Sequence, residues 1–178
     1  MTSSVADLWE TLAREAAAES SLWRDALRPV GSRDLVPVFS PLAEERFALG
    51  VETIYEAYLV HYGRPRLFEP PDGDEAVLLG DYLYAHGLVR ISALGDVDAV
   101  ADLAELISLC GQLRAEARDG DAAAWAATAA LLGAGALADG REALRRDGDA
   151  APLSRLAREA AGDAAVERAF AAHAGRVG

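Results

Sequence analysis

The chain has 178 residues, enough for one domain with a sizeable core, and its 17 basic and 29 acidic residues give a net charge of −12. All of the basic residues are Arg, and an acidic surface repels phosphate backbones and anionic lipid headgroups, which argues against nucleic-acid or membrane-surface binding through charge. The hydrophobic residues include 39 Ala and 24 Leu against 15 Val and Ile together, a ratio that favours helices over a β-sandwich or barrel.

The N-terminal segment, residues 1–39, is predicted to hold two helices and an extended connector. Apolar residues at helical spacing predict the first helix over residues 5–18, and a shorter one over residues 22–27 ends before Pro29. Residues 30–40 include a β-like run, but the prolines within and beside it fit a connector better than a central strand. The start of the segment shows no basic residues followed by an apolar run, so no secretion signal is expected.

Four stronger helices are predicted in the central segment, residues 40–140. In chain order they cover residues 40–62, 75–94, 97–117 and 122–138. Ser40, Asp96 and Asp121 are the expected N-terminal caps of the first, third and fourth of these helices. Gly63 is the expected end of the first helix, because glycine readily leaves the helical conformation.

The tail, residues 141–178, is rich in Ala and predicts two or three further helices. Since no long linker divides the chain, we expect a single all-α domain over residues 1–178. The one cysteine, Cys110, permits neither an internal disulfide nor a zinc site built from cysteines. No stretch reaches the roughly 18 uncharged apolar residues of a membrane helix, so we expect a cytoplasmic protein without a transmembrane segment.

The helix predicted over residues 75–94 is the most informative one. Its first half is apolar almost all round, which predicts a central, buried position. Gly80 lies inside it, and because a glycine there costs roughly 1 kcal/mol against Ala, we infer that a neighbouring helix approaches closely. Asp81, in such surroundings, is expected to be paired or hydrogen-bonded. Gly133 and Gly135, inside the last central helix, are interpreted in the same way as sites of close packing.

Residues that could carry chemistry are few. The three histidines, His61, His86 and His173, form no His-x-x-x-His or Glu-x-x-His pair, so we expect no metal site and no cofactor. The acidic cluster at residues 72–75 could contact a cation, but negative charge is also favoured at the start of a helix, which is our interpretation. No P-loop or nucleophile motif is present.

Two segments of the central region carry a resemblance to a known family. They are the run from Val51 to His61 and the run from Ala76 to Ala85, which contains Gly-Asp-Tyr-Leu. The first resembles the helix that leads into the first Asp-rich motif of the trans-polyprenyl diphosphate synthases, and the second resembles that family's Val-Leu-x-Gly-Asp-Tyr-Leu-x-Ala helix. The resemblance covers residues 40–140. It implies a helical bundle like a truncated isoprenoid synthase fold, with His61, Gly80, Asp81 and Tyr82 in structural or interface positions.

The residues that this family uses for catalysis are replaced here. Tyr62 and Gly63 stand where the family has two Mg²⁺-binding Asp after the histidine, and Ala127 precedes Thr128 where it has a Lys-Thr pair. No second Asp-rich motif follows. Ionising an allylic diphosphate needs divalent ions that bridge carboxylates to the leaving group. We therefore expect that the chain is not catalytic alone.

The resemblance implies a small regulatory subunit of a two-component synthase of long-chain prenyl diphosphates, with a catalytic subunit as its partner. Arg64 and Arg66 lie near the positions of the family's diphosphate-binding arginines. Ala57 and Tyr58 match the residues that close the floor of its chain-elongation cavity. Tyr58 has a second interpretation, because it also falls in an aromatic stripe at helical spacing that would pack in a core.

Two other functions stay open at this point. The chain could be a helical binding or scaffold protein that holds an isoprenoid tail or a different protein partner as an accessory subunit of a larger assembly. It could also be a residual enzyme that binds Mg²⁺ through the acidic cluster at residues 72–75. A subunit or a scaffold should expose an apolar face, since such a face marks an interface.

Overall fold

The computed structural model describes residues 5–177. Every element of secondary structure named in that range is a helix. In chain order the α-helices are α1 (Val5–Glu19), α2 (Ser21–Asp25), α3 (Ala48–Tyr62), α4 (Gly73–Ser92), α5 (Val97–Ala115), α6 (Asp121–Ala130), α7 (Ala138–Asp147), α8 (Ala151–Ala161) and α9 (Asp163–Val177). Three-residue turns of 3₁₀ helix lie at 30–32, 40–42 and 45–47. The predicted all-α fold is confirmed. None of the helices described is long and apolar enough to cross a bilayer.

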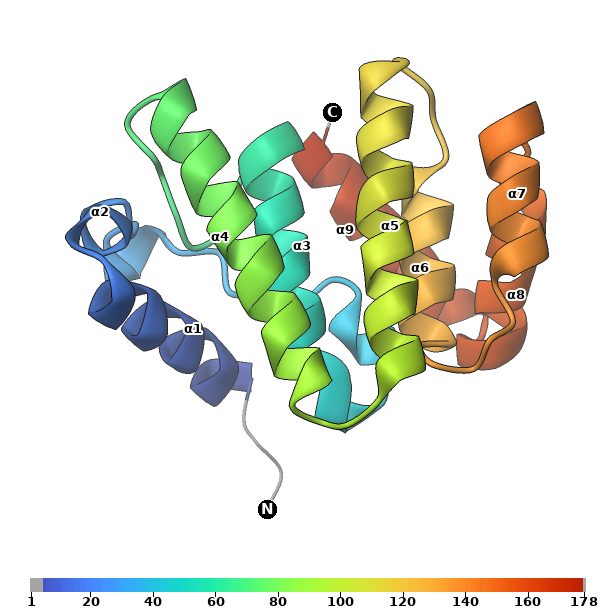
Figure 1. Cartoon of the computed structure of the whole chain (residues 1–178), viewed down its shortest axis with the longest axis horizontal. Helices are drawn as coiled ribbons and strands as arrows, with labels where there is room; N and C mark the ends of the chain where they lie inside the picture. The colour runs from blue at the N-terminus through green and yellow to red at the C-terminus, as the bar shows by residue number, and fades with distance from the viewer. Residues whose placement is uncertain (1–4, 178) are drawn as a thin grey trace.

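Helix α3 lies in the middle of the bundle. Figure 1 shows α4 crossing in front of it, α1 and α2 to one side, and α5 to α8 to the other. Every side chain from Val51 to Val60 is buried, and α3 contributes to two hydrophobic clusters. One cluster joins it to α5, α6, α8 and α9, and the other joins it to α1, α2 and α4. A helix that is buried on all sides must be apolar or have its polar groups paired.

A fully buried group of three charges meets this requirement. The Arg66 guanidinium, on the segment that follows α3, pairs with the carboxylates of Glu52 and Glu56, and all three side chains are inaccessible to solvent. Glu56 Oε1 also accepts the backbone N–H groups of Arg66 and Leu67, at 2.8 and 2.7 Å. Burial alone would lower the pKa of Arg66, but the two carboxylates outweigh it and raise that pKa above its ordinary value. The guanidinium is therefore always charged.

The same group holds the connector against α3. Glu52 Oε1 accepts the backbone N–H groups of Val38 and Ser40, at 3.1 and 3.0 Å. The prediction that a helix begins at Ser40 is wrong, because this contact fixes the chain beside α3 before the helix can start. Residues 40–47 instead make two 3₁₀ turns, and α3 begins at Ala48.

Helix α6 is shorter than predicted. It ends at Ala130, and the interpretation of Gly133 and Gly135 as helical packing sites is wrong, because both have a positive φ, of 80° and 67°. That conformation is easiest for glycine and ends a helix. The Gly133 N–H donates to Asp102 at 2.9 Å, and the same carboxylate pairs with Arg141 at 2.8 Å. The loop after α6 is thus held by a buried ion pair between α5 and α7.

The buried side of helix α4 is narrower than predicted. Leu79, Gly80 and Leu83 lie on the buried side, but Val77 and Leu78 are 52% and 56% exposed. The expectation that the first half of this helix is buried all round is therefore wrong. Its apolar pattern supplies one face to the core and leaves a second face in solvent.

Close packing joins α3 to α4. A Cβ added at Gly50 would lie 2.4 Å from the Ile91 side chain, and one added at Gly87 would lie 2.3 Å from the Ile54 side chain. Real Cβ atoms essentially never come this close to another heavy atom. Glycine at these positions therefore lets each helix receive an isoleucine from the other.

Replacing Arg66 by Met should lower the free energy of unfolding by about 3–5 kcal/mol, because two buried carboxylates lose their counter-charge. Urea unfolding at neutral pH measures the change. Arg155→Met on α8 is the matched control, since Arg155 is exposed and lies 3.8 Å from Glu159, and it should cost no more than about 0.5 kcal/mol. Equal losses in the two variants would contradict the role assigned to Arg66.

Candidate functional site

The last turns of α3 carry the aromatic stripe expected from the sequence. The ring of Tyr58 has its centroid 6.0 Å from that of Tyr55 and 5.2 Å from that of Tyr62. Trp125 on α6 packs against it at 5.6 Å with the two rings steeply inclined. Tyr58 and its neighbour Ala57 are completely buried. The structure thus places both of these predicted cavity residues within packed core.

The hydroxyl group of Tyr58 belongs to a polar network that links four helices. It donates to the carboxylate of Asp121 on α6 and accepts from Arg114 Nε on α5 at 2.7 Å. Arg114 also pairs with Asp121. The Nε2 atom of His173 on α9 lies 3.3 Å from the same carboxylate, an ion-pair distance without hydrogen-bond geometry. Nδ1 of His173 lies 2.9 Å from the hydroxyl group of Tyr55.

The charges in this network are fixed by their surroundings. Burial first, and then the neighbouring Asp121, raise the pKa of Tyr58 far above its ordinary value, so its hydroxyl stays protonated. Burial would also raise the pKa of Asp121, but its contacts with His173, Tyr58 and Arg114 hold that pKa well below the usual range. A tyrosine that stays protonated is poorly suited to acid–base catalysis near neutral pH. The arrangement acts as a polar anchor within the core.

The local sequence pattern gives no signal for this anchor. Asp121 is the expected cap of the fourth central helix, but the cap position belongs to Gly120, and Asp121 is the first residue of α6. His173 lies in the tail, where the sequence indicates no specific role for it. The structure buries His173 almost completely against α3, at 2% exposure.

The two arginines suggested as diphosphate ligands lie in different surroundings. Arg66 is buried in the ion group described above, where the carboxylates of Glu52 and Glu56 already bind it. Arg64 is exposed. Its guanidinium donates to the carbonyl oxygen of Gly175. Its backbone N–H donates to the carbonyl oxygen of Arg176 at 2.9 Å. The structure thus brings Arg64, but not Arg66, to a surface position near the end of α9.

His61 and Gly80 form the contact predicted between two central helices. A Cβ added at Gly80 would lie 2.3 Å from Nε2 of His61, so the close approach is confirmed. The same nitrogen lies 3.3 Å from Oδ1 of Asp81, without hydrogen-bond geometry. The Asp81 side chain is 69% exposed, so Asp81 lies at the surface and not in the buried surroundings expected. Burial lowers the pKa of His61, and Asp81 opposes this shift only in part. Tyr82 faces α2, where its ring stacks on Trp23 at 5.6 Å.

The acidic cluster at the start of α4 has the geometry of a helix cap. Asp72 accepts the backbone N–H of Glu75 at 2.9 Å, as an N-cap residue does. Among the residues described, no three His, Cys, Asp or Glu side chains are grouped so that they could hold a metal ion.

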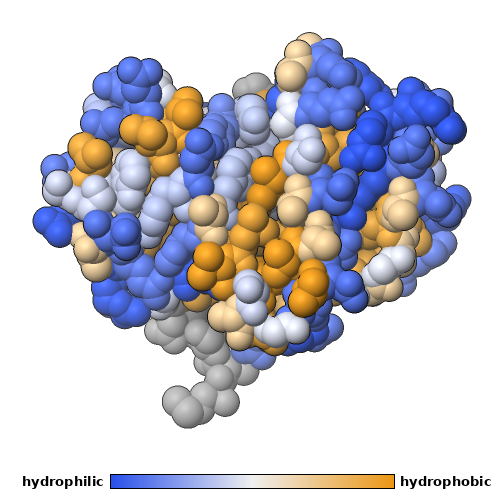
Figure 2. Space-filling model, in the orientation of Figure 1, coloured by the Kyte–Doolittle hydropathy of each residue, from blue (hydrophilic) through white to orange (hydrophobic). Residues whose placement is uncertain are grey.

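Apolar side chains gather on the outer side of the α4–α5 hairpin. Figure 2 shows them as an orange area over the lower halves of α4 and α5. We define the α4–α5 apolar face by Val89, Leu94 and Val97, which are 64%, 43% and 79% exposed, together with the half-buried Val100 beside them. Two hollows of about 270 and 160 Å³ border it near the loop between the helices. A contiguous face of this kind is typical of an interaction site.

Comparison with known proteins finds no matching family model, no similar curated sequence and no similar solved structure. The relation to the trans-polyprenyl diphosphate synthases therefore depends on the sequence motifs alone and stays a prediction.

Replacing Gly80 by Ala should destabilise the chain by about 1–3 kcal/mol, because the new methyl group overlaps the His61 ring. Gly175→Ala on α9 is the matched control, since a Cβ there meets no atom within 4 Å. Ala is the better helix former, so the control should gain up to about 1 kcal/mol. Thermal unfolding measures both, and an increase in Tm for Gly80→Ala would contradict the close contact.

Asp121→Asn tests the polar anchor through its pH dependence. The pKa of Asp121 in the folded chain is held below the ordinary 3.8, so its ionised form stabilises the fold at neutral pH. This contribution is lost as the pH falls below 3.8 and through the folded pKa. The variant should lose about 1–3 kcal/mol at neutral pH, and the difference from the parent should shrink in acid. Urea unfolding across pH measures this, with the exposed Asp119→Asn as control. A pH-independent difference would refute it.

Proposed function

We propose that this chain is the non-catalytic small subunit of a cytoplasmic two-component synthase of long-chain prenyl diphosphates, and that it binds the catalytic subunit through the α4–α5 apolar face. The observation that carries the proposal is the exposure of this face. Of ten large hydrophobic side chains exposed in the described part of the chain, this face holds three, Val89, Leu94 and Val97, and the start of α4 holds two more, Val77 and Leu78. Helix α4, which contributes to this face, also carries one of the two motifs that resemble the family.

The reaction would belong to the partner. Prenyl transfer needs carboxylates that hold divalent ions against a diphosphate, and the positions after His61 are Tyr62 and Gly63. The Tyr58 hydroxyl and Arg66 already bind carboxylates of this chain, which leaves them poorly placed to bind substrate. A regulatory effect on the partner, such as a change in product length, is the role that remains for a subunit of this kind.

Charge favours a partner other than a second copy. The hairpin from Gly73 to Ala115 carries seven acidic residues and two arginines, and the exposed Asp81 and Asp98 lie on it. Two copies would bring like charges together around the apolar face, in addition to a net charge of −12 on each chain. We therefore infer that the partner has an apolar patch with Arg or Lys at its rim.

Mixing the chain with a full-length prenyl synthase from the same genome tests the proposal. Size-exclusion chromatography and calorimetry should detect a complex at micromolar concentrations, and product analysis should find a changed chain length. The double variant Val89→Asn/Val97→Asn should bind at least about tenfold more weakly, because two apolar side chains at the interface are lost. Val30→Asn/Val36→Asn, at 76% and 55% exposure, is the matched control and should bind normally.

The outcomes separate the alternatives. Absence of a complex together with unchanged products would refute the proposal. Self-association that is abolished by the Val89/Val97 variant would assign the face to a second copy instead. An isoprenoid retained by the chain alone in native mass spectrometry would favour the scaffold function.

A further inference from the structure

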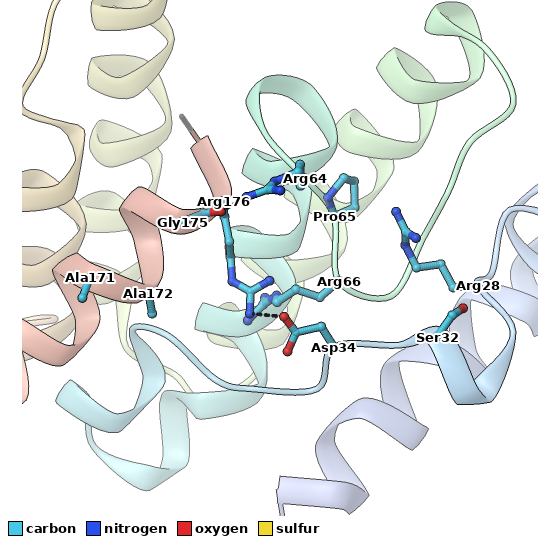
Figure 3. A pocket seen from close by; sticks show the side chains of 10 residues that line it. All are labelled: Arg28, Ser32, Asp34, Arg64, Pro65, Arg66, Ala171, Ala172, Gly175 and Arg176. Carbon is cyan, nitrogen blue, oxygen red and sulfur yellow. Dashed lines mark hydrogen bonds and ion pairs between the residues drawn. The ribbon is translucent and has the colours of Figure 1, made fainter.

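A cavity of about 410 Å³ lies away from the α4–α5 apolar face. Figure 3 shows that it is an open hollow lined by the connector after α2, the segment after α3 and the end of α9. Arg28, Arg64, Arg66 and Arg176 all line it, and Pro65 and Ala172 give it an apolar part. Its volume falls within the range of small-molecule sites.

Two of these guanidinium groups each pair with one exposed carboxylate, and the third, that of Arg64, pairs with none among the described residues. Arg28 lies 3.4 Å from Glu69, which is 66% exposed, and an exposed pair of this kind is weak. Among the described residues, the Arg64 side chain donates only to a backbone carbonyl oxygen. Arg176 pairs with Asp34 at 2.7 Å. The cavity therefore concentrates positive charge in a chain that is strongly acidic.

The Arg176 guanidinium is held in place at this cavity. Its side chain is only 13% exposed, and it pairs with Asp34. A side chain fixed in this way loses little conformational entropy when it binds a ligand.

We propose that this cavity binds a small molecule through a phosphate group, which Arg28, Arg64 and Arg176 hold while the rest of the molecule packs on Pro65 and Ala172. Guanidinium groups match the oxygen pairs of phosphate with parallel hydrogen bonds. The three arginines carry three positive charges against the two negative charges of Asp34 and Glu69. The remaining positive charge attracts a dianion more strongly than a monoanionic carboxylate. This site is independent of the proposed docking at the α4–α5 apolar face.

Occupancy of this site would join the segment after α2 to the end of α9. Arg28 comes from the connector after α2, and Arg176 comes from the last turns of α9. A ligand that binds only the folded state raises its stability. Binding should therefore increase Tm as well as produce heat in calorimetry.

Titration with n-butyl phosphate, inorganic phosphate and butyrate tests the proposal on the full chain. Butyl phosphate should bind and raise Tm, and butyrate should bind at least about tenfold more weakly. Arg28→Gln and Arg64→Gln should each weaken butyl phosphate binding about tenfold or more, since each removes charge-assisted hydrogen bonds. Arg64 is exposed, so its variant should fold even if Arg28→Gln does not. Arg155→Gln removes the same charge elsewhere and should leave binding unchanged.

Each result bears on the site. Equal binding of inorganic and butyl phosphate would support it and show that the phosphate group alone is recognised. No binding of either phosphate at millimolar concentration would overturn it. Equal affinity for butyrate, or equal weakening by Arg155→Gln, would also overturn it, because recognition would then be a general charge effect.

Discussion

The fold depends on three charges that have no access to water. Helix α3 is buried on every side, yet it carries Glu52 and Glu56 one turn apart, and buried carboxylates of this kind require a counter-charge. Arg66 provides it by folding back from the segment after the helix. Because the same carboxylates also accept backbone N–H groups on both flanking segments, the central helix and its two neighbours in the chain form one unit. The other helices are arranged around that unit.

A second polar centre, around Asp121, completes the core. Asp121 draws Tyr58, Arg114 and His173 together, and these residues come from helices that are distant in sequence. The resemblance to prenyl synthases assigns this region to a substrate cavity, whereas in the structure aromatic rings and a polar network fill the space around Tyr58. This packing agrees with the proposed role, in which the surface of the chain binds a partner and its interior binds no substrate.

Much of the fold is predictable from local pattern, because Ala and Leu favour helices and Asp96 sits where a cap is needed. The predictions fail where a contact with a residue distant in sequence determines the local structure. Ser40 resembles a helix start, but Glu52 holds it outside the helix. The pairing of Asp121 with His173 has no local signal, since 52 positions separate the two residues. The exposed side of α4 could not be identified either, because a surface kept for a partner has the same apolar pattern as one kept for a core.

The glycine contacts between α3 and α4 have a mechanical consequence. Gly50 and Gly87 receive isoleucines, and Gly80 receives the His61 ring, at distances that leave no free space. Helices interlocked in this way cannot slide along or rotate about each other without several overlaps at once. The outer surface of α4 therefore keeps one shape in the free chain. A partner would meet a rigid template, and little conformational entropy would be lost from this side when the two surfaces associate.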